Sequence, residues 1–216
     1  MTYLMICLVT LMLLALPGFA TTYDVALDFS PTSNPAGAWS YGWSSELTSP
    51  FGLYAHSFID RDIDHWTVTD PSPPNVSHNG TSGVITTNPE TIRWQPGQFA
   101  LHPGEAGEYS HARWTAPGDG TCDINAEFSG IDLTGTTTDV HVLHNGVVLF
   151  SGSVAGFDDT ELFSTSVSVG AGDTIDFAVG YGNGMYWDDT TALAAIISFQ
   201  TPVNPSTWAR VKAIHR

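Results

Sequence analysis

Apolar residues alternate with polar ones along most of this chain, and turn-forming residues interrupt the alternation at short intervals. The segment Thr138 to His144 alternates, meets Asn145-Gly146, and resumes from Val147 to Phe150. Because Asn and Gly both tolerate a positive φ, this segment predicts a hairpin with a two-residue type I′ turn. A period of two residues is typical of half-buried strands, and no convincing 3.6-residue helical period occurs after the first twenty residues.

The same pattern predicts further strands along the chain. They are Asp24 to Phe29, Trp66 to Thr69, Gly83 to Thr86, Thr91 to Trp94, Gln98 to Leu101, Glu108 to Trp114, Cys122 to Phe128, Phe163 to Val169, Thr174 to Tyr181 and Ala192 to Phe199. The last of these is continuously apolar, which suits a central strand. The segment from Asn34 to Asn79 is predicted to form long loops over a sheet face. About a dozen short strands without crossover helices indicate an all-β fold, a two-sheet antiparallel sandwich.

The first twenty residues differ from the rest of the chain. Leu4 to Leu16 is almost wholly apolar, and Gly18-Phe19-Ala20 has the small-x-small pattern of a signal-peptidase site. The apolar run has about 13 residues, whereas roughly 20 are needed to span a bilayer. We therefore predict a signal peptide over residues 1–20, cleavage after Ala20, and an exported mature chain without a membrane span.

The charge is strongly negative, with 22 acidic and 6 basic side chains and a formal net charge of −16. Nucleic acids and anionic membrane surfaces are poor partners for such a chain, because both are bound by basic patches. Residues 201–216 contain no acid but hold Arg210, Lys212 and Arg216. The predicted organisation is therefore a β-sandwich domain over residues 21–200, followed by a basic C-terminal tail.

Five segments carry a resemblance to a known family: Asn34 to Trp43, Leu101 to Gly104, Tyr109 to Pro117, Thr138 to Gly146 and Gly172 to Gly180. In this order they resemble a domain of exported bacterial proteins, many of which end in a PEP-CTERM sorting signal. The resemblance covers nearly the whole mature chain. It implies a jelly-roll-like sandwich of the kind used by carbohydrate-binding modules, and no established catalytic activity. The chain lacks the Val-Pro-Glu-Pro motif and the second apolar helix of the sorted proteins.

Aromatic residues are the strongest indication of function. Trp39, Tyr41 and Trp43 are two residues apart, so in an extended segment their side chains face the same way. Flat aromatic faces pack against the C–H faces of sugar rings, while polar neighbours fix the hydroxyl groups. We predict that this cluster binds carbohydrate, with Trp94 and Trp187 as further binding residues. The alternative is that they are core residues, as Trp and Tyr are in most sandwiches.

A calcium site is predicted in the loop from Gly180 to Thr190. Calcium takes six to eight oxygen ligands, often from Asp, Asn and backbone carbonyls in Gly-rich turns. This loop offers Asn183, Asp188 and Asp189 beside three glycines. The alternative is an ordinary acidic turn, since Asp and Gly are common in turns.

No motif predicts an enzyme. The acids at positions 60, 62 and 64 would share one side of an extended segment, but glycoside hydrolysis needs two carboxylates across a cleft. The sequence contains no Gly-x-Ser-x-Gly nucleophile motif. The prediction is a secreted, non-catalytic domain that binds a polysaccharide or glycan. The alternative is a structural subunit of extracellular matrix or cell surface that self-associates, with the unpaired Cys122 as one route to oligomers.

Overall fold

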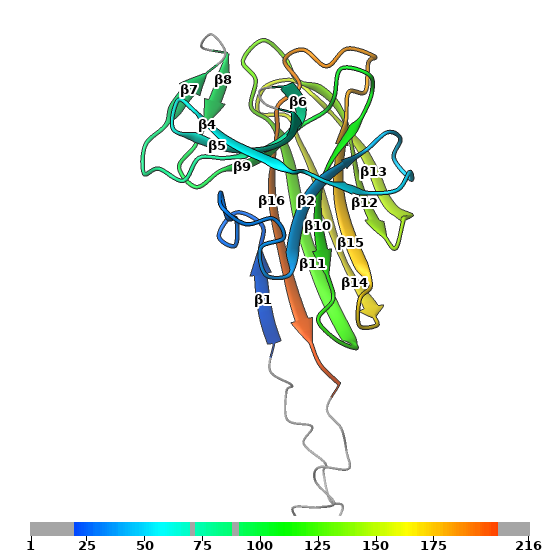
Figure 1. The fold of residues 1–216 in the computed structure, drawn as a ribbon. Helices are drawn as coiled ribbons and strands as arrows, with labels where there is room; N and C mark the ends of the chain where they lie inside the picture. The colour runs from blue at the N-terminus through cyan, green and yellow to red at the C-terminus, as the bar shows by residue number, and fades with distance from the viewer. Residues whose placement is uncertain (1–19, 70–71, 88–90, 203–216) are drawn as a thin grey trace, which may run out of the picture.

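The strands dominate the structure, a computed structural model that describes residues 20–69, 72–87 and 91–202 (Figure 1). These residues form sixteen strands and no helix, so the all-β prediction is confirmed. Within those three ranges, no helix is long and apolar enough to cross a membrane. Residues 1–19 of the predicted signal peptide and residues 203–216 of the predicted basic tail lie outside the described residues.

The larger sheet is antiparallel and has the strand order β14-β11-β16-β9-β6-β5-β4, with β1 also paired to β16. Its strands are β1 (Ala20–Asp24), β4 (His56–Asp60), β5 (Ile63–Thr69), β6 (Ser72–His78), β9 (Phe99–His102), β11 (Gly120–Gly130), β14 (Thr160–Val169) and β16 (Thr191–Gln200). The apolar strand β16 lies inside this sheet, between β11 on one side and β1 and β9 on the other. Its predicted central position is therefore confirmed.

The second sheet is also antiparallel and has the order β13-β12-β15-β10-β2-β3. Its strands are β2 (Trp39–Ser44), β3 (Gly52–Leu53), β10 (Tyr109–Thr115), β12 (Thr137–His144), β13 (Val147–Ala155) and β15 (Thr174–Gly180). A separate hairpin consists of β7 (Ile85–Thr87) and β8 (Ile92–Trp94). Buried side chains from both large sheets form one core, which includes Trp39, Phe99, Trp114, Phe128 and Phe177. The two sheets therefore pack as the predicted sandwich.

The Asn145-Gly146 hairpin is confirmed. It joins β12 to β13, and the φ values are 51° at Asn145 and 77° at Gly146. The Asn145 side chain also accepts a hydrogen bond from the backbone N–H of Thr174 at 2.8 Å, which ties the turn to β15. Both central residues therefore have the positive φ that a type I′ turn requires.

Replacing Gly146 with Val is expected to destabilise the fold by about 1–3 kcal/mol, because β-branched residues adopt this backbone region at a high cost. No heavy atom lies within 4 Å of a Cβ added at Gly146, so the loss would come from the backbone alone. Urea denaturation measures the change. Gly146→Asn is the control and should be nearly neutral, since Asn tolerates a positive φ; equal midpoints for Gly146→Val and the native protein would contradict the prediction.

The strand predicted at Asp24 to Phe29 is wrong, because β1 ends at Asp24. The carboxylate of Asp24 accepts hydrogen bonds from the backbone N–H groups of Ala26 and Leu27, at 2.9 and 3.1 Å. An Asp side chain that bonds the following backbone in this way favours a turn over a strand. Leu27, an apolar member of the predicted alternation, is exposed to solvent.

The long loops predicted between Asn34 and Asn79 are also a misassignment. This segment supplies five strands, β2 to β6, and β2 lies within the second sheet between β10 and β3. The side chain of Asn34 organises its start: Oδ1 accepts from the N–H of Tyr41, and Nδ2 donates to the carbonyls of Tyr41 and Tyr54. Polar residues such as Asn34 interrupt the alternation of apolar and polar residues in this segment, so the alternation did not predict its strands.

Candidate functional site

A cavity of about 660 Å³ lies on the part of the larger sheet formed by β4, β5, β6 and β9. The β7–β8 hairpin and the loop of residues 181–190 border it, at the end of the molecule remote from paired residues Ala20 and Gln200 (Figure 1). Its lining residues are Phe58, Ile59, Asp60, Arg61, His65, Pro73, Asn75, Ser77, Thr87, Ile92, Trp94, His102, Tyr186, Trp187, Asp188 and Thr190. The volume falls within the range of roughly 300–1,000 Å³ that is typical of small-molecule sites.

The floor of the cavity presents an imidazole acceptor. His102 Nδ1 lies 2.8 Å from the carbonyl oxygen of Pro103, which can only accept, so Nδ1 carries the hydrogen and Nε2 has a free lone pair. Burial lowers the pKa of His102, and this outweighs the hydrogen bond to Pro103 and the negative charges of Asp132 and Asp188, which raise it. The ring is therefore neutral at pH 7 and can accept a hydrogen bond from a ligand.

A relay of hydrogen bonds fixes an amide donor beside this imidazole. The hydroxyl of Ser77 donates to Asn75 Oδ1 at 2.9 Å, and its oxygen lies 2.8 Å from His65 Nδ1, which donates to it. The ring of Phe58 stacks on His65 with centroids 4.5 Å apart. This orientation leaves Asn75 Nδ2 without an acceptor among the described residues, so the amide can donate to a ligand.

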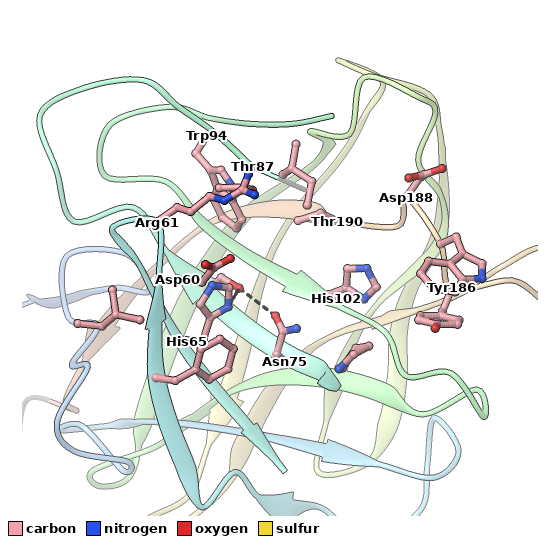
Figure 2. A pocket seen from close by; sticks show the side chains of 16 residues that line it. Asp60, Arg61, His65, Asn75, Thr87, Trp94, His102, Tyr186, Asp188 and Thr190 are labelled. Carbon is pink, nitrogen blue, oxygen red and sulfur yellow. Dashed lines mark hydrogen bonds between the residues drawn. The ribbon is translucent and has the colours of Figure 1, made fainter. Parts of the chain in front are cut away.

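Charged side chains line two opposite sides of the cavity (Figure 2). Asp60 and Arg61 come from the turn between β4 and β5, where Arg61 has a φ of 47°. Asp188 comes from the loop of residues 181–190, across the floor from that turn. None of the three forms an ion pair within the described part of the chain. The guanidinium and both carboxylates are therefore available to a ligand.

Two aromatic rings stand on the same side as Asp188. Tyr186 and Trp187 have ring centroids 4.5 Å apart, and Tyr186 also contacts His102 edge-on at 6.2 Å. Trp187 is 65% exposed although it is one of the largest apolar side chains in the protein. An exposed indole beside polar floor groups is the arrangement that stacks on a planar or ring-shaped ligand.

Strand β12 holds the loop that carries these rings. Asp139 Oδ1 accepts from the backbone N–H of Gly182 at 2.9 Å, and Thr137 Oγ1 accepts from Asn183 Nδ2 at 2.7 Å. Burial acts to raise the pKa of Asp139, but hydrogen bonds from His141, Tyr109 and Gly182 outweigh it and lower this pKa to about 2. Asp139 is therefore a carboxylate over the whole physiological range and anchors the loop throughout it.

The five predicted carbohydrate-binding residues lie in different places: some belong to the core and others line the cavity. Trp39 and Tyr41 are 0% exposed and belong to the core, so their predicted contact with a ligand is wrong. Trp43 is half-buried, packs against the same core and does not line the cavity. Trp94 and Trp187 do line it. Trp94 is buried and donates through Nε1 to Thr87 Oγ1 at 3.0 Å, so only Trp187 offers an open ring face.

The predicted metal ligands do not converge as one set. Asn183 Oδ1 accepts from the backbone N–H of Met185 at 2.8 Å, which commits this oxygen to a turn. Asp188 lines the cavity, whereas Asp189 is buried and accepts two hydrogen bonds from Thr137. No group of three His, Cys, Asp or Glu side chains that could hold a metal ion occurs in residues 20–69, 72–87 and 91–202.

Sequence reasoning missed the polar part of the cavity. Asp60, Arg61, Asn75 and His102 come from three separate strands or turns, and no local motif joins them. The acids at positions 60–64 do not share one face as expected, because the chain turns at Arg61 and Asp62 with positive φ. One signal was present, since His102 lies within Leu101 to Gly104, one of the segments that carry the family resemblance.

Comparison with known proteins finds solved structures of low similarity to this chain. No family model matches this chain, and no curated protein matches its sequence. A family 51 carbohydrate-binding module from Clostridium perfringens, in complex with methyl-galactose, is 12% identical with a TM-score of 0.36, over 68% of this chain and 94% of that one. A family 35 carbohydrate-binding module from Clostridium thermocellum is 11% identical with a TM-score of 0.30, over 68% and 100% of the two chains.

A third solved structure contains a family 51 module in complex with GlcNAc and further domains of a Clostridium perfringens protein. It is 12% identical with a TM-score of 0.37, over 74% of this chain and 32% of that one.

Proposed function

We propose that this protein is an exported, non-catalytic domain that binds a glycan in the cavity above β5, β6 and β9. The observation that carries the proposal is the 65% exposed indole of Trp187 beside a floor on which His102 Nε2 and Asn75 Nδ2 have no hydrogen-bond partner among the described residues. Trp187 would stack on the C–H face of a sugar ring. His102 Nε2 would accept a hydrogen bond from one of the sugar's hydroxyl groups, and Asn75 Nδ2 would donate one to another.

The charges in the cavity favour a neutral, hydroxyl-rich ligand. The carboxylate oxygens of Asp60 and Asp188 accept hydrogen bonds, so they match the O–H donors of a sugar. They would repel an anionic ligand, which the net charge of −16 opposes as well. A purely apolar ligand would remove these carboxylates from water without providing partners, which is costly. Arg61 supplies the complementary donor.

A glycan array probed with the purified protein tests this proposal. We expect binding to a restricted set of neutral glycans, without release of reducing sugar from the bound polysaccharide. Uniform absence of binding to neutral glycans would contradict the proposal, and release of reducing sugar would contradict its non-catalytic part.

Glycan affinity is expected to depend on the protonation of His102. Its pKa lies below the ordinary value of about 6.5, so the imidazole stays neutral from pH 8 down to about 6.5 and affinity should be constant there. At pH values below this lowered pKa, protonation of His102 turns Nε2 from an acceptor into a donor. We expect glycan affinity to fall roughly tenfold, which corresponds to the free energy of one hydrogen bond. Calorimetric titrations between pH 8 and 5 measure it, and a His102→Phe variant that still falls tenfold would show that another group is responsible.

The environment of Cys122 bears on the alternative function, a self-associating structural subunit. Cys122 is fully buried, and burial raises the pKa of its thiol to about 11. Thiolate is the reactive form of cysteine, so an inaccessible thiol with this pKa does not form disulfides between molecules. Burial of Cys122 therefore argues against a disulfide between folded molecules, while self-association itself stays a prediction.

A further inference from the structure

Two buried acidic residues, Asp132 and Asp189, lie on the two segments that extend the pairing of β11 and β16 beyond the strands. The last registered pair is Gly130 with Thr191, and the N–H of Ile131 continues the pairing by donating to the carbonyl of Thr190 at 3.2 Å. Asp132 and Asp189 occupy the next position on the two segments. The charge of Asp132 acts on Asp189 and is one of the causes that raise the pKa of Asp189.

Each of these carboxylates uses one oxygen and leaves the other without a partner. Asp132 Oδ1 accepts from the N–H and hydroxyl of Thr134, at 3.2 and 2.7 Å. Asp189 Oδ1 accepts from the N–H and hydroxyl of Thr137, at 2.8 and 3.1 Å. Both side chains are 0% exposed. Their Oδ2 atoms, and the nearby Thr190 Oγ1, are buried and have no hydrogen-bond partner in the described part of the chain.

Buried carboxylates require a counter-charge, because an isolated charge in a protein interior is very costly. The ion pairs of the described residues involve Asp139, Asp173 and Asp176, and neither Asp132 nor Asp189 takes part in one. Asp188 adds a further negative charge beside Asp189. Either a cation or a shared proton must therefore offset the charge of this pair.

We propose that Asp132 and Asp189 bind a calcium ion through their Oδ2 atoms, with Thr190 Oγ1 at the same site. The available ligands are all oxygens, which is the ligand type that calcium prefers, and two carboxylates match its double charge. The remaining ligands would be water or backbone carbonyl oxygens. Of the three ligands that the sequence predicted in the loop, only Asp189 belongs to this site. Asp132 and Thr190 take the places of Asn183 and Asp188.

The proposed ion would stabilise one side of the cavity. It binds the residue that directly follows Asp188, and Asp188 and Trp187 line the cavity. The ion would also tie the loop of residues 181–190 to the segment between β11 and β12, which carries Asp132. Calcium binding itself does not depend on the identity or the existence of a glycan ligand.

The test uses the chelator-treated protein, calcium chloride and thermal unfolding. Calcium that binds only the folded state stabilises it. At a calcium concentration a hundredfold above Kd, Tm should rise by roughly 5–10 °C for a chain of this size. Sodium chloride at equal ionic strength should not reproduce the gain. Asp132→Asn should abolish the calcium response, whereas Asp62→Asn, a change at an exposed acid in a turn, should retain it.

Calorimetric titration of the native protein with calcium gives a second readout that needs no variant. Saturable binding of one ion supports the site, and loss of that binding in Asp132→Asn locates it. Absence of binding would overturn the proposal. So would an equal Tm gain with sodium chloride, or a calcium response that Asp132→Asn retains. A protein that calcium does not affect and that gains stability from pH 7 to 5 would show that a proton on Asp189, whose pKa is raised to about 6, offsets the charge instead.

Discussion

Replacing Trp39 with Ala is expected to lower the free energy of unfolding by about 3–5 kcal/mol, the usual cost of removing a large aromatic side chain from a packed core. Trp39 is 0% exposed and lies between the two sheets. Its ring contacts Phe177 at a centroid distance of 6.1 Å, and its Nε1 donates to Asp28 Oδ2 at 3.2 Å. The substitution therefore removes contacts to both strand β15 and the turn after β1.

Urea denaturation followed by tryptophan fluorescence measures this loss. The matched control is Trp187→Ala, which removes the same side chain from a position 65% exposed to solvent and should change stability by less than about 1 kcal/mol. Equal losses for the two variants would contradict the assignment of Trp39 to the core and Trp187 to the surface.

Replacing Arg113 with Leu is expected to cost about 3 kcal/mol of stability. Arg113 Nε and Nη2 donate to the two oxygens of Asp176, at 2.7 and 3.1 Å. The Asp176 side chain is only 2% exposed, so the substitution leaves a buried carboxylate without its arginine. Removing one partner of a buried ion pair costs about 3–5 kcal/mol, and the lower value applies because Arg113 is itself partly exposed.

The dependence on pH separates this explanation from a simple loss of packing. Burial acts to raise the pKa of Asp176, but the hydrogen bonds from Arg113 and the nearby imidazole of His111, whose Nδ1 lies 3.7 Å from Oδ1, outweigh it and lower the pKa. A lowered carboxyl pKa stabilises the native protein above about pH 4, and this contribution disappears as the pH falls through the folded-state pKa. The difference between the native protein and Arg113→Leu should therefore shrink in acid. The double variant Arg113→Leu, Asp176→Asn should recover part of the loss at pH 7.

The fold was predictable wherever strands alternate regularly. Both strands of the β12–β13 hairpin and the apolar β16 were evident, because burial of one face imposes a period of two and burial of both faces imposes a continuous apolar run. Strand β6 was not evident, because Pro73 and Pro74 argue against a strand inside a sheet. In the structure the pairing of β6 with β9 begins only at Asn75, so neither proline has to donate to β9.

The candidate site was less predictable than the fold. Spacing by two residues showed that Trp39, Tyr41 and Trp43 share a face, but it could not show that the face points toward the other sheet. The cavity also depends on contacts between distant segments, as His102 and Trp187 illustrate. Composition made Trp187 one candidate among several, and only its exposure in the structure distinguishes it.

The most direct test of glycan binding in this cavity is calorimetric titration of matched variants with a neutral glycan that the protein binds on the array. Trp187→Ala should weaken binding about 30-fold or more, since loss of a central aromatic contact costs about 2 kcal/mol. Met185→Ala is the control, because Met185 is 59% exposed on the same loop and does not line the cavity. We expect Met185→Ala to bind as the native protein does. Native affinity in Trp187→Ala, or an equal loss in both variants, would contradict glycan binding in this cavity.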